Sequence, residues 1–291
     1  MGMGGKEDKN STTFEVSLHT ALGHDEWATM LEKRHAETGM ELVATRIADA
    51  PTGVCIVISG DEDRAFMTQS GSMAKLTTEM LDMAKLRQAK HLHIGGFFSV
   101  PKLQAGLADL VRELRATTPE LTVSLDTNYD ASETWGRDGT GYLDALLGEV
   151  DVFLPNETEA CAIADTKDIR EAAQNLCLRL RSPGGAAIVT NGAEGCLVAE
   201  KTMGNETNVQ VHTVPGARVS SIVDATGAGD AFNAAFLHAW ISGASLTEAA
   251  SKGVLGGTVA ILHEGACDTL LTPWLMERLA ENVQDSEEGE Q

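Results

Sequence analysis

Aromatic and basic residues are both scarce in this sequence of 291 residues. Phe, Tyr and Trp together make up 4%, so Gly, Ala and Leu carry the packing, as is common in α/β folds. Lys and Arg number 22 against 43 Asp and Glu, which gives a net charge of −21. Such an acidic surface repels nucleic acids and anionic membranes, and we exclude both as partners.

Cysteine pairs and long apolar runs are also missing. The five cysteines lie far apart with no C-x-x-C pair, a spacing that suits neither a zinc site nor a disulfide framework. No apolar run approaches a membrane span, and the N-terminus lacks the apolar region of a signal peptide. With an ordinary apolar fraction of 43%, the sequence predicts a cytoplasmic protein with reduced core cysteines.

The chain divides into a long central domain and two short ends. Residues 1–17 are expected to be disordered or atypical, 18–284 to form one domain, and 285–291 to form an acidic tail. Apolar residues at helical spacing predict a helix over 25–38. Three short β-type runs separated by turns predict a small antiparallel meander, at 42–47, 54–59 and 64–68.

From residue 74 onward, helix patterns alternate with strand patterns. The expected helices are 75–89, 101–115, 141–147, 157–164, 168–180, 228–241 and 246–262; the expected strands are 91–95, 121–126, 150–154 and 186–190, with a hairpin over 196–214. This alternation indicates βαβ units and a mainly parallel sheet covered by helices on both faces, a three-layer α/β/α sandwich. Ligands in such sheets bind beyond the carboxyl ends of the strands.

The most informative stretch runs from Asp224 to Asp230, with the sequence Asp-Ala-Thr-Gly-Ala-Gly-Asp, directly before a long apolar helix. Glycines let backbone N–H groups approach a ligand, and the first N–H groups of a helix are unpaired and partly positive. Together they form an anion hole suited to a phosphoryl group. Asp230 stands beside it, where a carboxylate can accept the proton of an attacking hydroxyl. The alternative is a glycine-rich turn with a first-turn acid.

This string resembles the C-terminal signature of the ribokinase-like carbohydrate kinases, the PfkB family, usually D-T-x-G-A-G-D. The resemblance implies a ribokinase-like sandwich with a partial β lid at about 41–70, and ATP and Mg²⁺ as cofactors. It implies that Asp230 is the catalytic base, that Gly227, Ala228 and Gly229 form the anion hole, and that Thr226 contacts the nucleotide.

Two further motifs match the nucleotide side of the family. Asn156 and Glu159 match N-x-x-E, which implies a role for Glu159 at Mg²⁺ through water; the alternative is an N-cap with its capping box. The other motif, T-x-G-x-x-G, borders the nucleotide in the family and is matched at Thr190, Gly192 and Gly195. Its alternative is an ordinary tight turn.

The remaining landmarks concern the substrate and a monovalent cation. Asp126 and Asn128 match the family's D-P-N turn, and Gly96 matches its small-residue turn at the sugar site; all three are expected to bind substrate, with Asx-turn closure of a loop as the alternative for the first two. Asp224, with carbonyl groups from 260–269, matches the position of a K⁺ site.

The family's usual opening, a buried strand with an acidic sugar-binding residue and then a Gly-Gly-Asn motif, has no counterpart before Leu22. We therefore expect an altered substrate side. The leading hypothesis is an ATP-dependent kinase of an alcohol group on a sugar or related small molecule. The alternatives are a nucleoside kinase of the same family and a catalytically weak nucleotide-binding or scaffold protein. A homodimer is the expected assembly.

Overall fold

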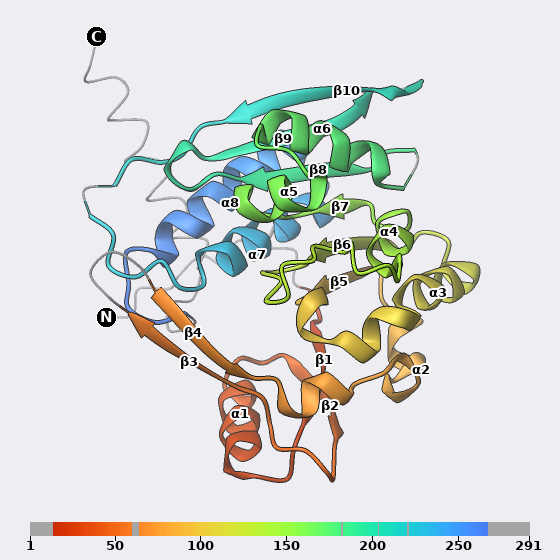
Figure 1. Ribbon diagram of the computed structural model, residues 1–291, viewed down its shortest axis with the longest axis vertical. Helices are drawn as coiled ribbons and strands as arrows, with labels where there is room; N and C mark the ends of the chain where they lie inside the picture. The colour runs from red at the N-terminus through yellow and green to blue at the C-terminus, as the bar shows by residue number, and fades with distance from the viewer. Residues whose placement is uncertain (1–13, 60–63, 182, 203, 220, 267–291) are drawn as a thin grey trace, which may run out of the picture. The chain divides into compact units, whose positions relative to one another are not determined.

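The computed structural model describes residues 14–59, 64–181, 183–202, 204–219 and 221–266 (Figure 1). They belong to two compact units, divided between Asp82 and Met83. The expectations for residues 1–13 and for the acidic tail lie outside the described residues. The unit boundary comes after the predicted lid.

In the first unit, strand β1 (Ser17–Leu22) pairs in parallel with β2 (Glu41–Arg46), and helix α1 (Glu26–Ala36) connects them. Asp25 begins the helix, because one carboxylate oxygen accepts the Ala28 N–H at 2.9 Å. Its carboxylate also accepts the N–H and hydroxyl of Thr52, each at 2.7 Å. Asp25 therefore caps the helix and ties it to the turn before the next strand.

The predicted antiparallel meander is only partly correct. Strands β3 (Val54–Ser59) and β4 (Arg64–Gln69) form an antiparallel pair in which Val57 faces Phe66, but β2 pairs with β1 instead. The sequence predicts no strand before Leu22, whereas the structure has β1. The partner that fixes β1 lies 24 residues along the chain, from Ser17 to Glu41, beyond the reach of a local pattern.

The helix expected over 75–89 is also wrong. Short 3₁₀ turns, η1 (Gly71–Lys75) and η2 (Thr78–Met80), are followed by one short helix, α2 (Met83–Leu86). Between the turns Leu76 and Thr77 take extended backbone conformations, with ψ of 132° and 165°. Leu76 is buried there, so burial of one leucine overrides the local helical preference.

Most of the second unit is built around one mixed sheet. Among the described residues its strand order is β10-β9-β8-β7-β6-β5. The strands are β5 (His91–Gly95), β6 (Thr122–Asp126), β7 (Val152–Phe153), β8 (Ala186–Thr190), β9 (Cys196–Thr202) and β10 (Asn205–Val214). β5 to β8 are parallel, and β9 and β10 add an antiparallel hairpin at the edge. The mainly parallel sheet is confirmed.

Helices cover both faces of this sheet (Figure 1). They are α3 (Pro101–Thr117), α4 (Tyr142–Leu147), α5 (Glu157–Ala164), α6 (Ile169–Arg179), α7 (Ala228–Ile241) and α8 (Leu246–Ala260). Alternate residues of β8 mark the two faces: Ile188 belongs to a core cluster with Phe232 and Phe236 of α7, so Val189 points to the opposite face. The three-layer sandwich is therefore confirmed within this unit.

The edge strand β5 carries two histidines on one face. His91 contacts the hydroxyls of Thr122 and Ser124 at 2.8 and 2.9 Å, and His93 contacts Ser124 at 2.7 Å. Desolvation lowers the pKa of each imidazole to about 4, so both are neutral at pH 7. These bonds fasten β5 to β6.

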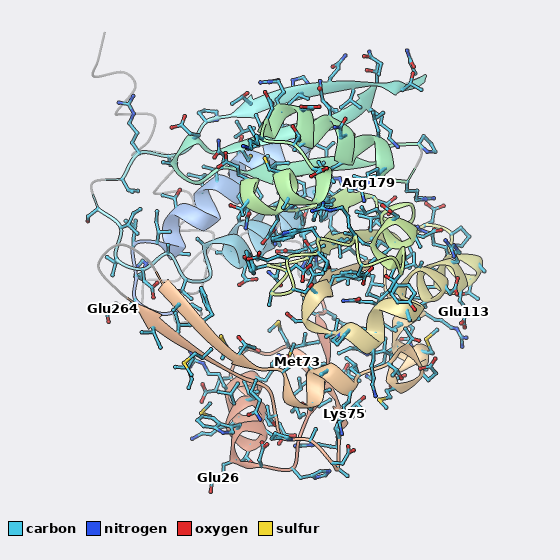
Figure 2. All side chains as sticks on the ribbon, in the orientation of Figure 1. Glu26, Met73, Lys75, Glu113, Arg179 and Glu264 are labelled. Atoms are coloured by element: carbon cyan, nitrogen blue, oxygen red, sulfur yellow. The ribbon has the colours of Figure 1, made fainter. Side chains whose placement is uncertain are left out.

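Charged side chains such as Glu26 of α1 and Glu113 of α3 point outward from their own units (Figure 2). None of the helices in the described part of the chain is long and apolar enough to cross a bilayer.

Candidate active site

The start of α7 has the backbone geometry that its glycines predict. Gly227 has a φ of +79° and directly precedes the helix. A Cβ on Gly227 would lie 2.6 Å from the Ala266 carbonyl oxygen, so both its backbone conformation and its surroundings require glycine. At Gly229, in contrast, a Cβ would meet nothing within 4 Å. The first turn of α7 therefore leaves open space beside Gly229, while the Ala228 N–H donates to the Ala225 oxygen at 3.4 Å.

Asp230 lies in the first turn of α7, beside that open space. The residue is exposed overall, yet the protein around it desolvates the carboxyl group and raises its pKa above the usual range. A carboxylate with a raised pKa is a stronger base than a free aspartate. A helix start can bind a phosphoryl group, and a nearby carboxylate can accept a proton. Phosphoryl transfer to an alcohol requires both.

Asp126 is the last residue of β6, and hydrogen bonds hold both oxygens of its carboxylate. One carboxylate oxygen accepts the Asn128 N–H at 2.9 Å, and the other accepts the side-chain amide of Asn233 at 2.7 Å. Its backbone oxygen accepts the Gly96 N–H at 2.9 Å. Burial, with a smaller contribution from the charge of Asp230, raises the pKa of Asp126 to about 6. The structure thus brings Gly96, Asp126, Asn128 and Asp230 together.

Asn156 and Glu159 follow β7 and begin α5. The Asn156 side chain accepts the Glu159 N–H at 2.9 Å, and the Glu159 carboxylate accepts the Asn156 N–H at 3.1 Å, a complete capping box. The alternative interpretation of this motif is therefore confirmed. Glu159 is nevertheless only 5% exposed, and burial, then the charge of Asp126, raises its pKa to about 7. A cap alone does not need so buried an acid.

The turn after β8 is placed next to this cap. Thr190 forms a parallel bridge with Asn156, and its N–H donates to the Pro155 oxygen at 3.1 Å. Gly192 and Gly195 both have positive φ, and a Cβ on Gly195 would lie 2.1 Å from the Val214 oxygen. Gly195 therefore serves the close packing of this turn, and Thr190 is the member of the motif that lies next to the acid cluster.

Asp224 and Thr226 lie in the segment before α7, which is hydrogen-bonded to the segment after α8. One Asp224 oxygen accepts the Thr226 N–H at 2.8 Å, and the other accepts the Gly265 N–H at 3.2 Å. The Val223 N–H donates to the Ile261 oxygen at 2.8 Å. These bonds bring the expected cation segment next to Asp224 as far as residue 266; residues 267–269 lie outside the described residues.

Asn233 is the residue of this cluster that the sequence did not reveal. Its one local signal is an amide in an apolar helical run, three residues after Asp230 and so on the same helix face. Asp126, its partner, is 107 residues away, and no local pattern indicates that distance.

A helix start with glycines, a carboxylate of raised pKa and further acids at the carboxyl ends of parallel strands are typical of a phosphotransferase of the α/β sandwich class. The chain belongs to the pfkB family of carbohydrate kinases, which matches residues 10–273. The predicted family is thus confirmed, and with it ATP-dependent phosphotransfer to a sugar or nucleoside.

Individual relatives and structures agree with this assignment. The chain is similar to an uncharacterized sugar kinase of Archaeoglobus fulgidus, at 27% identity over 85% of this chain and 90% of the relative. It is 25% identical to Anopheles gambiae adenosine kinase in complex with a di(adenosine) tetraphosphate, over 86% and 74% of the two chains, with a TM-score of 0.74. A putative Escherichia coli ribokinase II in complex with ATP and Mg²⁺ shares the fold: TM-score 0.79, 19% identity, 92% and 83% covered.

Proposed function

We propose that Asp230 removes the proton of an acceptor alcohol as the alcohol attacks the γ-phosphoryl group of ATP, within the start of α7. The observation that carries this proposal is the geometry of one helix start. Gly227 has a conformation that only glycine adopts easily, Gly229 faces open space, and Asp230 follows with a raised pKa. Backbone N–H groups there stabilise the charge that develops on the phosphoryl oxygens.

The acid cluster fits a hydrated Mg²⁺. The charge of Asp126 raises the pKa of Glu159, and no Lys or Arg among the described residues contributes to the shift of either acid. A cation would relieve that repulsion. Magnesium keeps several of its waters and takes carboxylates through them, so acids one shell away suit it. When bound, Mg²⁺ neutralises phosphate charge; Glu159 and Asp126 would hold its water shell.

The remaining binding roles follow the same arrangement. We propose that Asn156, Thr190, Gly192, Gly195 and Thr226 border the nucleotide, and that Gly96, Asp126 and Asn128 border the acceptor. Asp224 is proposed as a K⁺ residue, supported by its bond to Gly265 in the segment after α8. An activity assay with K⁺ replaced by tetramethylammonium tests that site: a K⁺ site predicts reduced turnover.

The experiment that tests the activity is an acceptor panel with ATP and Mg²⁺. ADP release and product mass are measured for ribose, fructose, 2-dehydro-3-deoxygluconate and adenosine, alongside the binding of ATP alone. Adenosine is included because the similarity to Anopheles gambiae adenosine kinase makes a nucleoside the second candidate acceptor. ATP binding without phosphorylation of any acceptor would contradict the kinase and favour a nucleotide-binding scaffold.

We also propose a cytoplasmic homodimer. The four described cysteines are free thiols, as expected in a reducing compartment. Apolar side chains on the β3–β4 pair are exposed, among them Ile56, Phe66 and Met67. Such a patch is typical of a protein interface. Sedimentation of the wild type and of Phe66→Glu tests the assembly: a dimer through this surface predicts a monomeric variant, and a monomeric wild type contradicts it.

A further inference from the structure

A buried hydrogen bond joins the helix of the proposed base to the end of a sheet strand. Asn233 of α7 donates from its side-chain amide to the carboxylate of Asp126 at 2.7 Å. The two residues are only 6% and 8% exposed. Asn233 lies three residues after Asp230, so both side chains project from the same face of α7. Any shift of this bond would also move Asp230 relative to the end of β6.

The carboxylate of Asp126 is held at both oxygens. The Asn128 N–H donates to one oxygen at 2.9 Å, and Asn233 donates to the other. Asn128 itself has a φ of +53°, an uncommon backbone conformation that this bond helps to hold. With both oxygens occupied, the plane of the carboxylate is fixed with respect to α7.

The charged groups coupled to this carboxylate are acids. The charge of Asp230 on α7 disfavours the charge of Asp126, and the charge of Asp126 in turn raises the pKa of Glu159 on α5. Burial raises the pKa of Asp126 to about 6, and the bonds from Asn128 and Asn233 oppose that rise. Loss of the Asn233 donor would therefore turn Asp126 toward its neutral form at pH 7.

A purely structural role is less consistent with the surroundings. The neighbours Phe232 and Phe236 show that α7 otherwise buries apolar side chains against the sheet. Replacing a buried polar pair by apolar residues is often neutral or stabilising, so packing alone does not call for an Asn–Asp pair here. The pair lies one helical turn from the proposed base, where the position and charge of a carboxylate affect proton transfer.

We propose that Asn233 is a positioning residue for phosphoryl transfer. By holding one oxygen of the Asp126 carboxylate, it sets the place of α7, and with it the place of Asp230, against the end of β6. This inference rests on the proposed function, because it assigns Asn233 a role through the base of that reaction.

The test begins with Asn233→Ala and with Asn233→Ser as a second variant in case the first folds poorly. We measure kcat and KM from pH 5 to 9, using ATP–Mg²⁺ and the acceptor found in the panel. A displaced base predicts a roughly 10–100-fold lower kcat, whereas ATP affinity should change less than about threefold, because the anion hole is built from backbone.

Asn233→Gln is the conservative variant, because its side-chain amide can still donate a hydrogen bond to the Asp126 carboxylate. It should keep more of the kcat than Asn233→Ala does. Thr258→Val is the matched control, because it removes a buried hydroxyl whose bond to the Val254 oxygen stays within α8. It should leave kcat and ATP affinity unchanged.

A carboxyl titration separates this proposal from the proposed function. Carbon-13 NMR of the wild type and Asn233→Ala, without nucleotide, reports the titration midpoint of Asp126. The midpoint should rise in the variant even if the wild type phosphorylates no acceptor, an outcome that would contradict only the kinase activity. An unchanged midpoint overturns the proposal, as does an active wild type whose Asn233→Ala variant keeps its kcat.

Discussion

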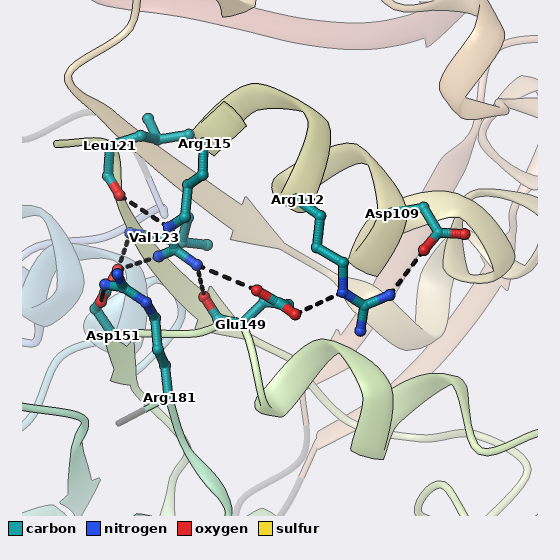
Figure 3. Close-up of polar contacts among 8 residues, drawn as sticks. All are labelled: Asp109, Arg112, Arg115, Leu121, Val123, Glu149, Asp151 and Arg181. Atoms are coloured by element: carbon teal, nitrogen blue, oxygen red, sulfur yellow. Dashed lines mark hydrogen bonds and ion pairs between the residues drawn. The ribbon is translucent and has the colours of Figure 1, made fainter. Parts of the chain in front are cut away.

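Arg115 and Asp151 form a nearly buried ion pair at the amino ends of the sheet strands, the end opposite the candidate active site (Figure 3). The guanidinium lies 2.5 Å from the carboxylate, and about a tenth of each side chain is exposed. Asp151 also accepts the Val123 N–H and a bond from Arg181, each at 2.7 Å. One carboxylate thus joins α3, β6 and the segment before β8.

Removal of the Asp151 carboxylate should destabilise the protein without altering its chemistry. Asp151→Ala leaves Arg115 buried without its main partner, and breaking one side of a buried pair costs about 3–5 kcal/mol. Chemical denaturation should show this loss, while ATP affinity measured on the folded fraction should be unchanged. A change in unfolding free energy below about 1 kcal/mol would place the pair among ordinary surface contacts.

Asp109 supplies the control for that experiment. It pairs with Arg112 at 2.7 Å, at the solvent-exposed end of the same network, and its side chain is 82% exposed. Exposed pairs contribute about 0.2–1 kcal/mol, so Asp109→Ala should remain close to the wild type in stability.

Where local chemistry decides the structure, the sequence predicts it well. Asn156 and Glu159 form the capping box that their spacing indicates, and α5 and α7 have the predicted bounds. Gly227 has the positive φ that a glycine before a helix suggests. The candidate site could be assembled from sequence because its motifs follow strand ends, which parallel pairing brings to one edge.

What the sequence could not predict depends on distant partners. β1 is defined by pairing with β2, and the 75–89 segment is broken where Leu76 is buried. The role of Asn233 depends on its hydrogen bond to Asp126, a residue that only the tertiary structure brings close to it. The Asp151 network likewise joins residues about 30 positions apart. Composition and periodicity do not encode these contacts.

Asp230→Asn tests the proposed base. The amide cannot accept the acceptor's proton, so kcat should fall by about 10²–10⁴-fold. ATP affinity should stay within a small factor, because backbone groups at the helix start do not change. Steady-state kinetics with a parallel ATP-binding titration make the comparison. A variant with most of its turnover would mean that another group accepts the proton.

Glu159→Gln separates the metal from the helix cap. Glutamine at this position still completes a capping box, so the variant should fold like the wild type. The loss of charge should raise the Mg²⁺ concentration needed for half-maximal activity, with little change in acceptor KM. Activity titrated with Mg²⁺ measures the effect. An unchanged Mg²⁺ titration would mean that Asn156 and Glu159 serve only as a helix cap.

The contribution of Asp126 and Glu159 to metal-free stability should fall as the pH rises from about 4 through 7. The folded-state pKa values of the two acids, about 6 and about 7, lie above their ordinary values of 3.8 and 4.5. At these two groups the folded protein therefore binds more protons than the unfolded chain, and their contribution is lost as they ionise. His91 and His93, with pKa values lowered to about 4, act in the opposite direction, so the test compares variants with the wild type. Unfolding free energies in EDTA should rise more steeply with pH in Asp126→Asn and in Glu159→Gln than in the wild type; equal slopes would contradict the prediction.

Gly229→Ala should raise stability and lower activity. A Cβ at Gly229 meets nothing within 4 Å, and alanine in a helix is favoured over glycine by about 0.5–1 kcal/mol. The methyl group would occupy the space next to the helix-start N–H groups, so turnover should fall while the melting temperature stays equal or rises. Gly227→Ala is the matched comparison: with a φ of +79° and the Ala266 oxygen 2.6 Å from the new Cβ, it should lose stability as well as activity. The melting temperature and the turnover of both variants test this prediction. Full turnover in Gly229→Ala would mean that the phosphoryl group does not approach α7 at this residue.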